Sequence, residues 1–396
     1  MTPGPAQSPT ESPAPLRIAM LAHSTNPRGG VVHAIELADS LTRLGHQAVV
    51  HAPDAAGKGF FRAPLLPAVA VMAQPAAKDV ADMVRARIAD YLRHFEILDN
   101  RGFDIFHAQD SISGNALATL KQRGLIGRFA RTVHHIDHFS DPRLAEWQTR
   151  SIVEADELFV VSELWQKHIL SAFGRDSIVI GNGVDTTRFS GAARAIDQEV
   201  RAKYGINGSH VLLSVGGIEE RKNSIRILEA FAQVLTIHRD AQLVIVGGAS
   251  LLDHGLYRKQ FAAQLSANGI LDRAVRCLGP VPDAEMPSLY RLADALVFPS
   301  VKEGFGLAVL EAMASGTPVV TSRIEPFTEY LHESDAVWCD PINVGSIANA
   351  MAMVLTEPLR SRLKQRGVLV ARQHDWSNTA RAHLPGYQRL TELQHA

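Results

Sequence analysis

The chain has 396 residues, of which 46% are hydrophobic and 20% are charged, and its formal net charge is −1. This length exceeds what one hydrophobic core usually serves, so two domains are expected. The near-neutral charge excludes a protein that binds nucleic acid mainly by neutralising phosphates, because such proteins carry a basic excess. Composition does not decide whether one face carries a local basic patch, which would favour peripheral contact with an anionic membrane surface.

The ends and the cysteines of the chain indicate its cellular compartment. Residues 1–15 hold five prolines and no apolar core, which predicts a disordered leader and not a signal peptide. The apolar region from Ala63 to Ala77 is interrupted by prolines and is too short to span a bilayer. Cys277 and Cys339 have no metal-type spacing, so a soluble protein in the reducing cytoplasm is predicted.

The first half of the chain alternates short apolar runs with amphipathic stretches. Arg17 to His23 has the composition of a buried parallel strand, and a helix is predicted from Val31 to Leu44, where Gly45 ends it. A longer helix is expected around Lys78 to Leu98. Further strands are predicted at Gln47 to His51, Asp104 to Ala108, Ala130 to His134, Glu157 to Val161 and Ser177 to Ile180.

The second half repeats this pattern. A strand from Val211 to Val215 precedes Gly216-Gly217, and a strand from Gln242 to Val246 precedes Gly247-Gly248. Between these strands a helix is predicted from Asn223 to Leu235. The remaining predicted strands are Ala274 to Leu278, Ala295 to Phe298 and Pro318 to Thr321.

Strands that alternate with helices predict parallel sheets covered on both faces. The expected fold class is therefore α/β, with two Rossmann-like, doubly wound domains at residues 16–185 and 186–375. Turn residues place the interdomain connection from about Gly181 to Ser190. Residues 376–396 are predicted to form a C-terminal helix that packs back on the first domain. Ligands of open parallel sheets bind beyond the C-terminal strand ends, so the site is expected in an interdomain cleft.

The most informative segment runs from Pro299 to Pro318 and contains Glu303 and Glu311. Gly304 and Gly306 permit close backbone approach to a ligand, and the helix that follows offers free N–H groups to an anion. Two carboxylates around a helix N-terminus suit a nucleotide sugar, with sugar hydroxyls at one end and ribose hydroxyls at the other. A solvated loop glutamate and a glutamate that favours the helix dipole would explain the spacing alone. The flanking glycines favour the functional interpretation.

Arg221 and Lys222 follow the glycine pair of the second cycle. Negative charge builds on a diphosphate leaving group as the glycosidic bond breaks, and fixed cations stabilise it. A solvated basic pair is the alternative, but basic residues at a helix N-terminus oppose the helix dipole. The Gly29-Gly30 turn would face this pair across the cleft, although a tight strand-to-helix turn explains a glycine pair equally well.

Three histidines, His134, His135 and His138, lie at the end of a predicted first-domain strand. No carboxylate or cysteine partner has a familiar metal-ligand spacing, so a metal site is not expected. The preferred role is one polar contact to a sugar from His134, with the other two histidines at the surface. His107 and Asp110 end another strand and are placed on the acceptor side.

Taken together, these segments resemble the retaining GT-B glycosyltransferases of glycosyltransferase family 4, also called the group 1 glycosyl transferases. The resemblance covers about residues 17–353. Two positions depart from it: Gly217 stands where many members carry an arginine, and His135 where an acidic residue is frequent. The segments that carry the resemblance are Gly29-Gly30, His134, the hinge Ile180 to Asp185, Val215 to Asn223, Gly279 to Pro287, and Glu303-x7-Glu311.

The resemblance implies a role for each matching residue. Glu303 would contact donor-sugar hydroxyls, Glu311 the ribose, and Arg221 and Lys222 the diphosphate. His134 would lie beside the transferred sugar. The backbone would assist at the diphosphate and meet the nucleobase through a further set of donor-binding residues: Gly29, Gly30, Gly304, Phe305, Gly306, Leu307 and Val281.

The predicted function is therefore transfer of a hexosyl group from a UDP- or GDP-sugar to a hydroxyl acceptor, with retention of anomeric configuration, in carbohydrate biosynthesis. No Asp-x-Asp motif is present, so neither a metal nor another cofactor is expected. A nucleotide-sugar epimerase, a phosphorolytic enzyme on the same fold, and a non-catalytic nucleotide-sugar binding protein are the alternatives. A dinucleotide-dependent dehydrogenase is disfavoured, because Gly-x-Gly-x-x-Gly is missing after the first strand.

Overall fold

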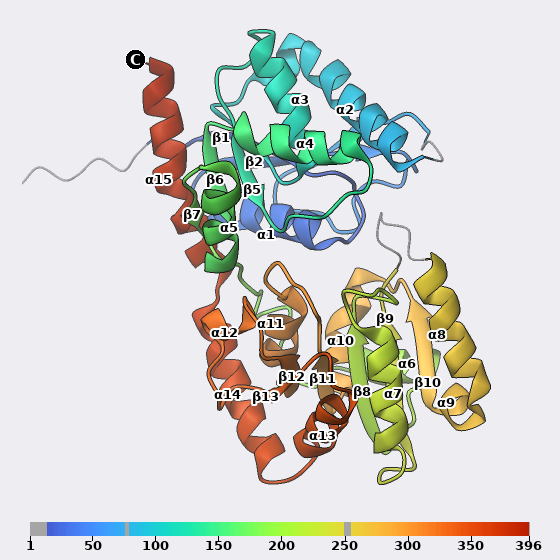
Figure 1. Cartoon of the computed structure of the whole chain (residues 1–396). Helices are drawn as coiled ribbons and strands as arrows, with labels where there is room; N and C mark the ends of the chain where they lie inside the picture. Colours follow the sequence, from blue (N-terminus) through green and yellow to red (C-terminus); the bar gives the residue numbers. More distant parts are fainter. Residues whose placement is uncertain (1–13, 76–78, 249–254, 396) are drawn as a thin grey trace, which may run out of the picture.

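The chain forms two α/β domains in a computed structural model that describes residues 14–75, 79–248 and 255–395 (Figure 1). Most of the leader predicted for residues 1–15, and the predicted helix start at Lys78, lie outside the described residues. Each domain contains one parallel sheet with helices on its faces. The predicted α/β class with two doubly wound sheets is therefore confirmed.

The N-terminal domain contains a seven-stranded sheet in the order β3-β2-β1-β4-β5-β6-β7. Its strands are β1 (Arg17–Leu21), β2 (Gln47–Asp54), β3 (Val69–Met72), β4 (Ile105–Ala108), β5 (Ala130–Val133), β6 (Glu157–Val160) and β7 (Ile178–Val179). Its helices are α1 (Gly29–Arg43), α2 (Val80–Glu96), α3 (Ser111–Gln122), α4 (Pro142–Val153) and α5 (Glu163–Phe173), with a short 3-10 helix at Leu98–Arg101.

The C-terminal domain contains a six-stranded sheet in the order β10-β9-β8-β11-β12-β13. Its strands are β8 (His210–Val215), β9 (Ala241–Val246), β10 (Val275–Gly279), β11 (Ala295–Phe298), β12 (Val319–Ser322) and β13 (Val337–Cys339). Its helices are α6 (Ile196–Lys203), α7 (Ser224–Val234), α8 (Gly255–Ala267), α9 (Gly269–Ala274), α10 (Met286–Leu292), α11 (Leu307–Ala314), α12 (Phe327–Tyr330), α13 (Val344–Val354) and α14 (Leu359–Gln373).

The central strands are formed by short apolar runs because both faces of each sheet are covered. Every residue of β4, β5, β11 and β12 is buried, as expected for parallel strands between two helical layers. The sequence did not predict β3 or β13. Strand β3 lies in a proline-containing region and pairs with β2 at the edge of the sheet, and Val71 is the one buried residue of its four.

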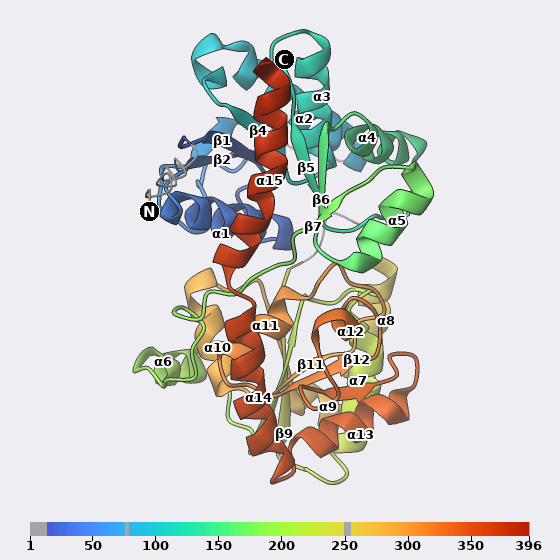
Figure 2. The ribbon, with the colours of Figure 1, turned by 90° about the vertical axis from the view of Figure 1, so that its left-hand side faces the viewer.

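The last helix, α15 (Trp376–His395), leaves the C-terminal domain and lies against the N-terminal one, packed on α1 (Figure 2). The two segments that connect the domains run side by side, and the N–H of Val184 donates to the carbonyl of His374 at 2.8 Å. Gly183 permits this approach, since a Cβ there would lie 2.5 Å from the Trp376 nitrogen. The C-terminal helix is thus part of the N-terminal domain's packing.

Strand order reverses between β1 and β4 in the first sheet and between β8 and β11 in the second. Such switch points open a crevice at the C-terminal strand ends, where ligands of this fold bind. Loops from the two crevices touch: the Lys302 ammonium, after β11, donates to the carbonyl of Ile136, after β5, at 2.8 Å. Gly29-Gly30, Arg221-Lys222 and Glu303 follow β1, β8 and β11, whereas His134 follows β5.

Candidate active site at the domain interface

The loop between β8 and α7 carries Arg221 and Lys222 to the end of β11. Gly216 has a φ of 127°, and a Cβ there would lie 2.6 Å from Lys222 Cε, so a glycine is needed for the lysine side chain to cross the loop. Asn223 has a left-handed φ of 64°, and its side-chain amide donates to the carbonyl of Pro299 at 3.0 Å. These contacts fix the direction of both cations.

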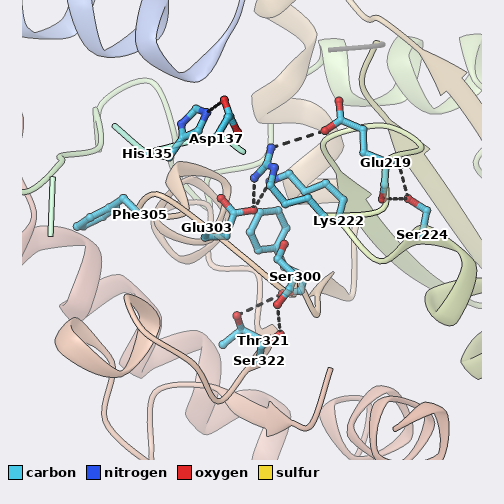
Figure 3. Close-up of polar contacts among 12 residues, drawn as sticks. His135, Asp137, Glu219, Lys222, Ser224, Ser300, Glu303, Phe305, Thr321 and Ser322 are labelled. Atoms are coloured by element: carbon cyan, nitrogen blue, oxygen red, sulfur yellow. Dashed lines mark hydrogen bonds and ion pairs between the residues drawn. The ribbon is translucent and has the colours of Figure 1, made fainter. Parts of the chain in front are cut away.

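Arg221 and Lys222 both donate hydrogen bonds to the same carboxylate oxygen of Glu303 (Figure 3). Arg221 Nη1 lies 2.7 Å and Lys222 Nζ 2.6 Å from Glu303 Oε1. Burial by itself would raise the pKa of Glu303, but the charges of Lys222 and Arg221 outweigh it and hold this pKa below its usual value. The carboxylate is therefore ionised at neutral pH.

Lys222 is the more buried of the two cations. Burial lowers the pKa of Lys222 to about 8, although the charge of Glu303 opposes the shift. Its ammonium also lies 4.1 Å from the centroid of the Phe298 ring, a distance at which the ring stabilises a cation. Arg221 is partly exposed and also faces Glu219 at 3.7 Å. The site therefore joins one titratable and one permanent positive charge.

Helix α11 begins at Leu307 behind Glu303. Gly306 is its N-cap with a φ of 100°, and a Cβ there would lie 2.5 Å from the Phe327 ring. No side chain caps this helix among the described residues. First-turn N–H groups without a side-chain cap are suited to an anion, because they carry the positive end of the helix dipole.

Gly304 and Phe305 have different surroundings. A Cβ on Gly304 would lie 2.3 Å from the carbonyl oxygen of His134, so this glycine lets the two domains touch. The Phe305 ring stacks on Tyr330 with centroids 4.6 Å apart and an interplanar angle of 3°. Because this ring is used in packing, Phe305 has only its backbone to offer a ligand.

Glu311, on α11, belongs to a second polar group. The Tyr290 hydroxyl donates to Glu311 Oε2 at 2.7 Å. Burial raises the pKa of Glu311, with the Tyr290 hydrogen bond and the charge of Arg188 acting against it. Arg188 in turn pairs with Asp283 at 2.7 Å. Val281, two residues before Asp283, is partly buried and packs against the hydrophobic core.

The N-terminal domain contributes Gly30 and His134. Gly30 lies in the first turn of α1, and a Cβ there would lie 3.4 Å from His134 Cδ2, whereas Gly29 has open space around it. His134 follows β5 and is half-buried, and its Nε2 lies 3.0 Å from Gln109 Oε1. Burial lowers the pKa of His134 well below its usual value, so the ring is neutral at neutral pH.

The other candidate residues of this domain are placed differently. His135 is exposed and contacts Asp137 at 3.1 Å, and His138 is exposed. His107 was placed on the acceptor side, but it is fully buried and contacts Tyr387 and Thr132, so it cannot line a cleft. Within the described ranges, no group of three or more His, Cys, Asp or Glu side chains could hold a metal ion.

Sequence reasoning missed several residues that shape this site. Asn223 orients the cations from an unusual backbone conformation, and Gln109 contacts His134 from the end of β4. Gly217 has a φ of 79°, and a Cβ there would lie 2.7 Å from the carbonyl of Gly248, which explains why no arginine stands at this position. The paired glycines after β8 and β9 were visible in the sequence, but their mutual contact was not.

Comparisons with known proteins agree with this architecture. Residues 196–370 match the family model described as Glycosyl transferases group 1, and residues 27–188 match the model described as Glycosyltransferase Family 4. A phosphatidyl-myo-inositol mannosyltransferase of Mycobacterium tuberculosis is 33% identical over 237 residues, which are 58% of this chain and 58% of that protein. An O-antigen chain mannosyltransferase B of Escherichia coli is 29% identical over 277 residues, which are 66% of this chain and 71% of that protein.

Solved structures share the fold. The crystal structure of Anabaena Alr3699/HepE in complex with UDP and glucose aligns with a TM-score of 0.76 at 19% identity, over 94% of this chain and 99% of that one. The sucrose-phosphate synthase from Thermosynechococcus elongatus aligns with a TM-score of 0.78 at 19% identity, over 95% of this chain and 99% of that one.

The fold defines the class of this protein as one with the GT-B architecture, and each half of the chain matches a glycosyltransferase family model. Its C-terminal half carries a Glycosyl transferases group 1 domain and its N-terminal half a Glycosyltransferase Family 4 domain. The matched segment spans 58% of the length of the mycobacterial mannosyltransferase. Among the described helices, none has the length and apolar character that crossing a membrane requires.

Proposed function

We propose that this chain transfers a hexosyl group from a nucleotide-diphosphate sugar to a hydroxyl acceptor, with retention of anomeric configuration. The observation that carries the proposal is the ion-paired cluster of Arg221, Lys222 and Glu303 in front of the uncapped end of α11. Cations and helix amides suit a diphosphate, and a carboxylate suits sugar hydroxyls. One small cluster thus offers what both parts of the donor require.

In the proposed complex the diphosphate lies between the two cations and the first turn of α11. Glu303, held by the same cations, accepts hydrogen bonds from sugar hydroxyls. Glu311 accepts hydrogen bonds from the ribose, after a rearrangement of its bond to Tyr290. His134 and Gly30 complete the site from the N-terminal domain, where Gly30 leaves room for the donor.

Charge supports a transfer that needs no metal ion. The leaving diphosphate gains negative charge in the transition state, and Arg221 and Lys222 lie where they would stabilise it. A metal ion supplies the same stabilisation in other enzymes. The hydrogen bonds of Arg221 and Lys222 to Glu303 hold both cations in place before the donor binds. Little reorganisation is therefore needed during the reaction.

Retention follows from the proposed chemistry of the cleft. Retaining glycosidases use a free carboxylate as a nucleophile, but Glu303 is bound to two cations, which makes it a poor one. We therefore propose same-face substitution: the bond from the sugar to the diphosphate breaks, the acceptor oxygen bonds to the same face, and the leaving phosphate takes the acceptor proton.

The activities of the relatives and the ligands of the structural neighbours support a particular class of donor. The relatives quoted above are mannosyltransferases, and one structural neighbour holds UDP and glucose. We propose a UDP- or GDP-activated hexose as the donor, with the acceptor bound by the first-domain loops. An epimerase or a phosphorolytic enzyme would use the same cleft, but an epimerase needs no acceptor and a phosphorylase needs inorganic phosphate.

The test is a thermal-shift panel of UDP-, GDP-, ADP- and dTDP-sugars, followed by release of nucleoside diphosphate with candidate acceptors. The anomeric configuration of the product is then read by NMR. We expect one donor to stabilise the protein and Lys222→Ala to abolish transfer while the fold survives. Donor binding without diphosphate release, with every acceptor, would instead identify a nucleotide-sugar binding protein.

A further inference from the structure

Gln109 directly follows β4 and lies next to His134. Its side chain is 2% exposed, and its Oε1 lies 3.0 Å from His134 Nε2. Its amide nitrogen contacts the sulfur of Met20 at 2.8 Å and lies 3.4 Å from His107 Nε2. A buried amide therefore links the sheet interior to the ring of His134.

Met20 determines which way this amide points. A thioether sulfur accepts hydrogen bonds weakly and donates none. When its amide nitrogen faces Met20, Gln109 donates a hydrogen bond to the sulfur. In the reversed orientation the carbonyl oxygen of Gln109 would face the sulfur, and this hydrogen bond would be lost. The carbonyl of Gln109 therefore faces His134. Since a carbonyl only accepts, the hydrogen of the neutral imidazole lies on His134 Nε2.

The contacts of His107 are consistent with this direction. Burial lowers the pKa of His107 well below its usual value, so this ring also carries one hydrogen. Its Nε2 faces the Gln109 amide and lies 2.8 Å from the Thr132 hydroxyl, so Nε2 accepts. Its Nδ1 then donates to the Tyr387 hydroxyl at 2.8 Å. Hydrogen bonds thus run without a break from α15 to His134.

The second ring nitrogen of His134 is left with a lone pair. No hydrogen bond from the described part of the chain reaches His134 Nδ1, and the ring is half-buried. The Cδ2–Nε2 edge faces Gly30 and Gln109, so Nδ1 lies on the other edge of the ring. A hydroxyl group donates or accepts according to its partner, so the tautomer decides the direction of any bond formed there.

We infer that Gln109 is a positioning residue that holds His134 in its Nε2–H tautomer, so that Nδ1 accepts a hydrogen bond from a hydroxyl of the transferred sugar. The part that concerns the sugar rests on the proposed function. Gln109 acts through His134 and does not itself contact the donor. The wrong tautomer would present an N–H where an acceptor is needed and would misalign the sugar.

The tautomer is measured on the full chain, labelled with ¹⁵N-histidine, by long-range ¹H–¹⁵N NMR, with the His134 signal assigned from a His134→Asn variant. We expect the Nε2–H form in the unmodified chain. Gln109→Leu removes the acceptor and gives a mixture of tautomers, and Met20→Leu gives a partial mixture because the amide is free to turn. Gln122→Leu, at the end of α3, is the control and leaves the signal unchanged.

Kinetics give the second readout. Gln109→Leu lowers kcat/KM for the donor about tenfold, the factor that one neutral hydrogen bond supplies. An Nδ1–H form in the unmodified chain, or an unchanged tautomer in Gln109→Leu, overturns the inference. If the tautomers are as expected but the unmodified chain transfers no sugar, the proposed function is overturned. The role of Gln109 in setting the tautomer of His134 is then still supported.

Discussion

Lys222 Nζ lies 2.6 Å from Glu303 Oε1, and the two residues come from loops 81 positions apart in the chain. Arg221 reaches the same oxygen. This bond joins the end of β8 to the end of β11, the two strands at which the order of the second sheet reverses. Each side chain keeps the other ionised, and together they hold the charges that the proposed donor needs.

Replacing Glu303 tests the carboxylate. Glu303→Gln has nearly the same shape but no charge, so it cannot hold two cations or bind sugar hydroxyls as strongly. We expect kcat/KM for the donor to fall by about 10²–10³, the effect of losing one preorganised electrostatic group. Initial rates of diphosphate release measure it. Glu333→Gln removes an exposed carboxylate paired with Arg323 and serves as the control. Equal losses in both variants would contradict the assignment.

The pKa of Lys222 predicts how donor binding depends on pH. Burial lowers this pKa to about 8, so the ammonium is charged below that pH and loses its proton above it. We expect KM for the donor to rise as the pH passes about 8, with a smaller change in kcat.

Lys222→Arg provides the matched control for this pH dependence, because a guanidinium stays protonated to a pH above about 12. Its donor KM is expected to remain flat over the alkaline range, even if its value at neutral pH is higher. A KM that rises equally in both proteins would assign the titration to a different group.

Replacing Gly30 tests whether this glycine is needed for the fold or for making room for a ligand. It lies in the first turn of α1, and a Cβ there makes only ordinary contact with His134. Gly30→Ala should therefore leave the free energy of unfolding unchanged or raise it by up to about 1 kcal/mol. Donor affinity, measured by calorimetry, should fall at least tenfold if the donor lies against this turn. Unchanged affinity would remove Gly30 from the site.

Gly217 should behave in the opposite way. Its φ of 79° and the 2.7 Å from a Cβ to the Gly248 carbonyl leave no room for a side chain. We expect Gly217→Ala to lower the free energy of unfolding by about 1–3 kcal/mol, measured by urea denaturation. Gly29→Ala, which has open space, is the control. Equal stability of the two variants would show that the loop adapts.

Glu329 of α12 holds the two domains together at α5. Its carboxylate accepts from the N–H groups of Glu163 and Leu164 at 2.8 and 2.9 Å, and α5 has no side-chain cap of its own. Glu329→Ala removes a cap worth about 1 kcal/mol, so we expect a wider separation of the domains and a donor KM raised about fivefold. Small-angle scattering and steady-state kinetics measure these effects. Glu333→Ala is the control, and an unchanged radius of gyration would refute this role.

The sequence predicted much of the fold because each parallel strand is a short apolar run that a glycine or a polar residue ends. It also singled out Glu303, Arg221 and Lys222, which the fold brings together, and their role in binding a donor stays a prediction. It missed β3 and β13, which are edge strands of four and three residues, too short to show a periodicity. It placed His107 on the acceptor side, because the sequence does not reveal that Tyr387 of α15 covers it.

Local sequence thus determined the alternation of strands and helices, and with it two parallel sheets whose ligands bind at their C-terminal edges. Only the tertiary structure decided which of the edge residues meet. The bond from Lys222 to Glu303, the contact between Gly304 and His134, and the orientation of Gln109 all join segments distant in the chain. The physical reason is that hydrophobic patterning depends on neighbouring residues, whereas ion pairing, tautomers and close backbone contacts depend on how separate segments pack.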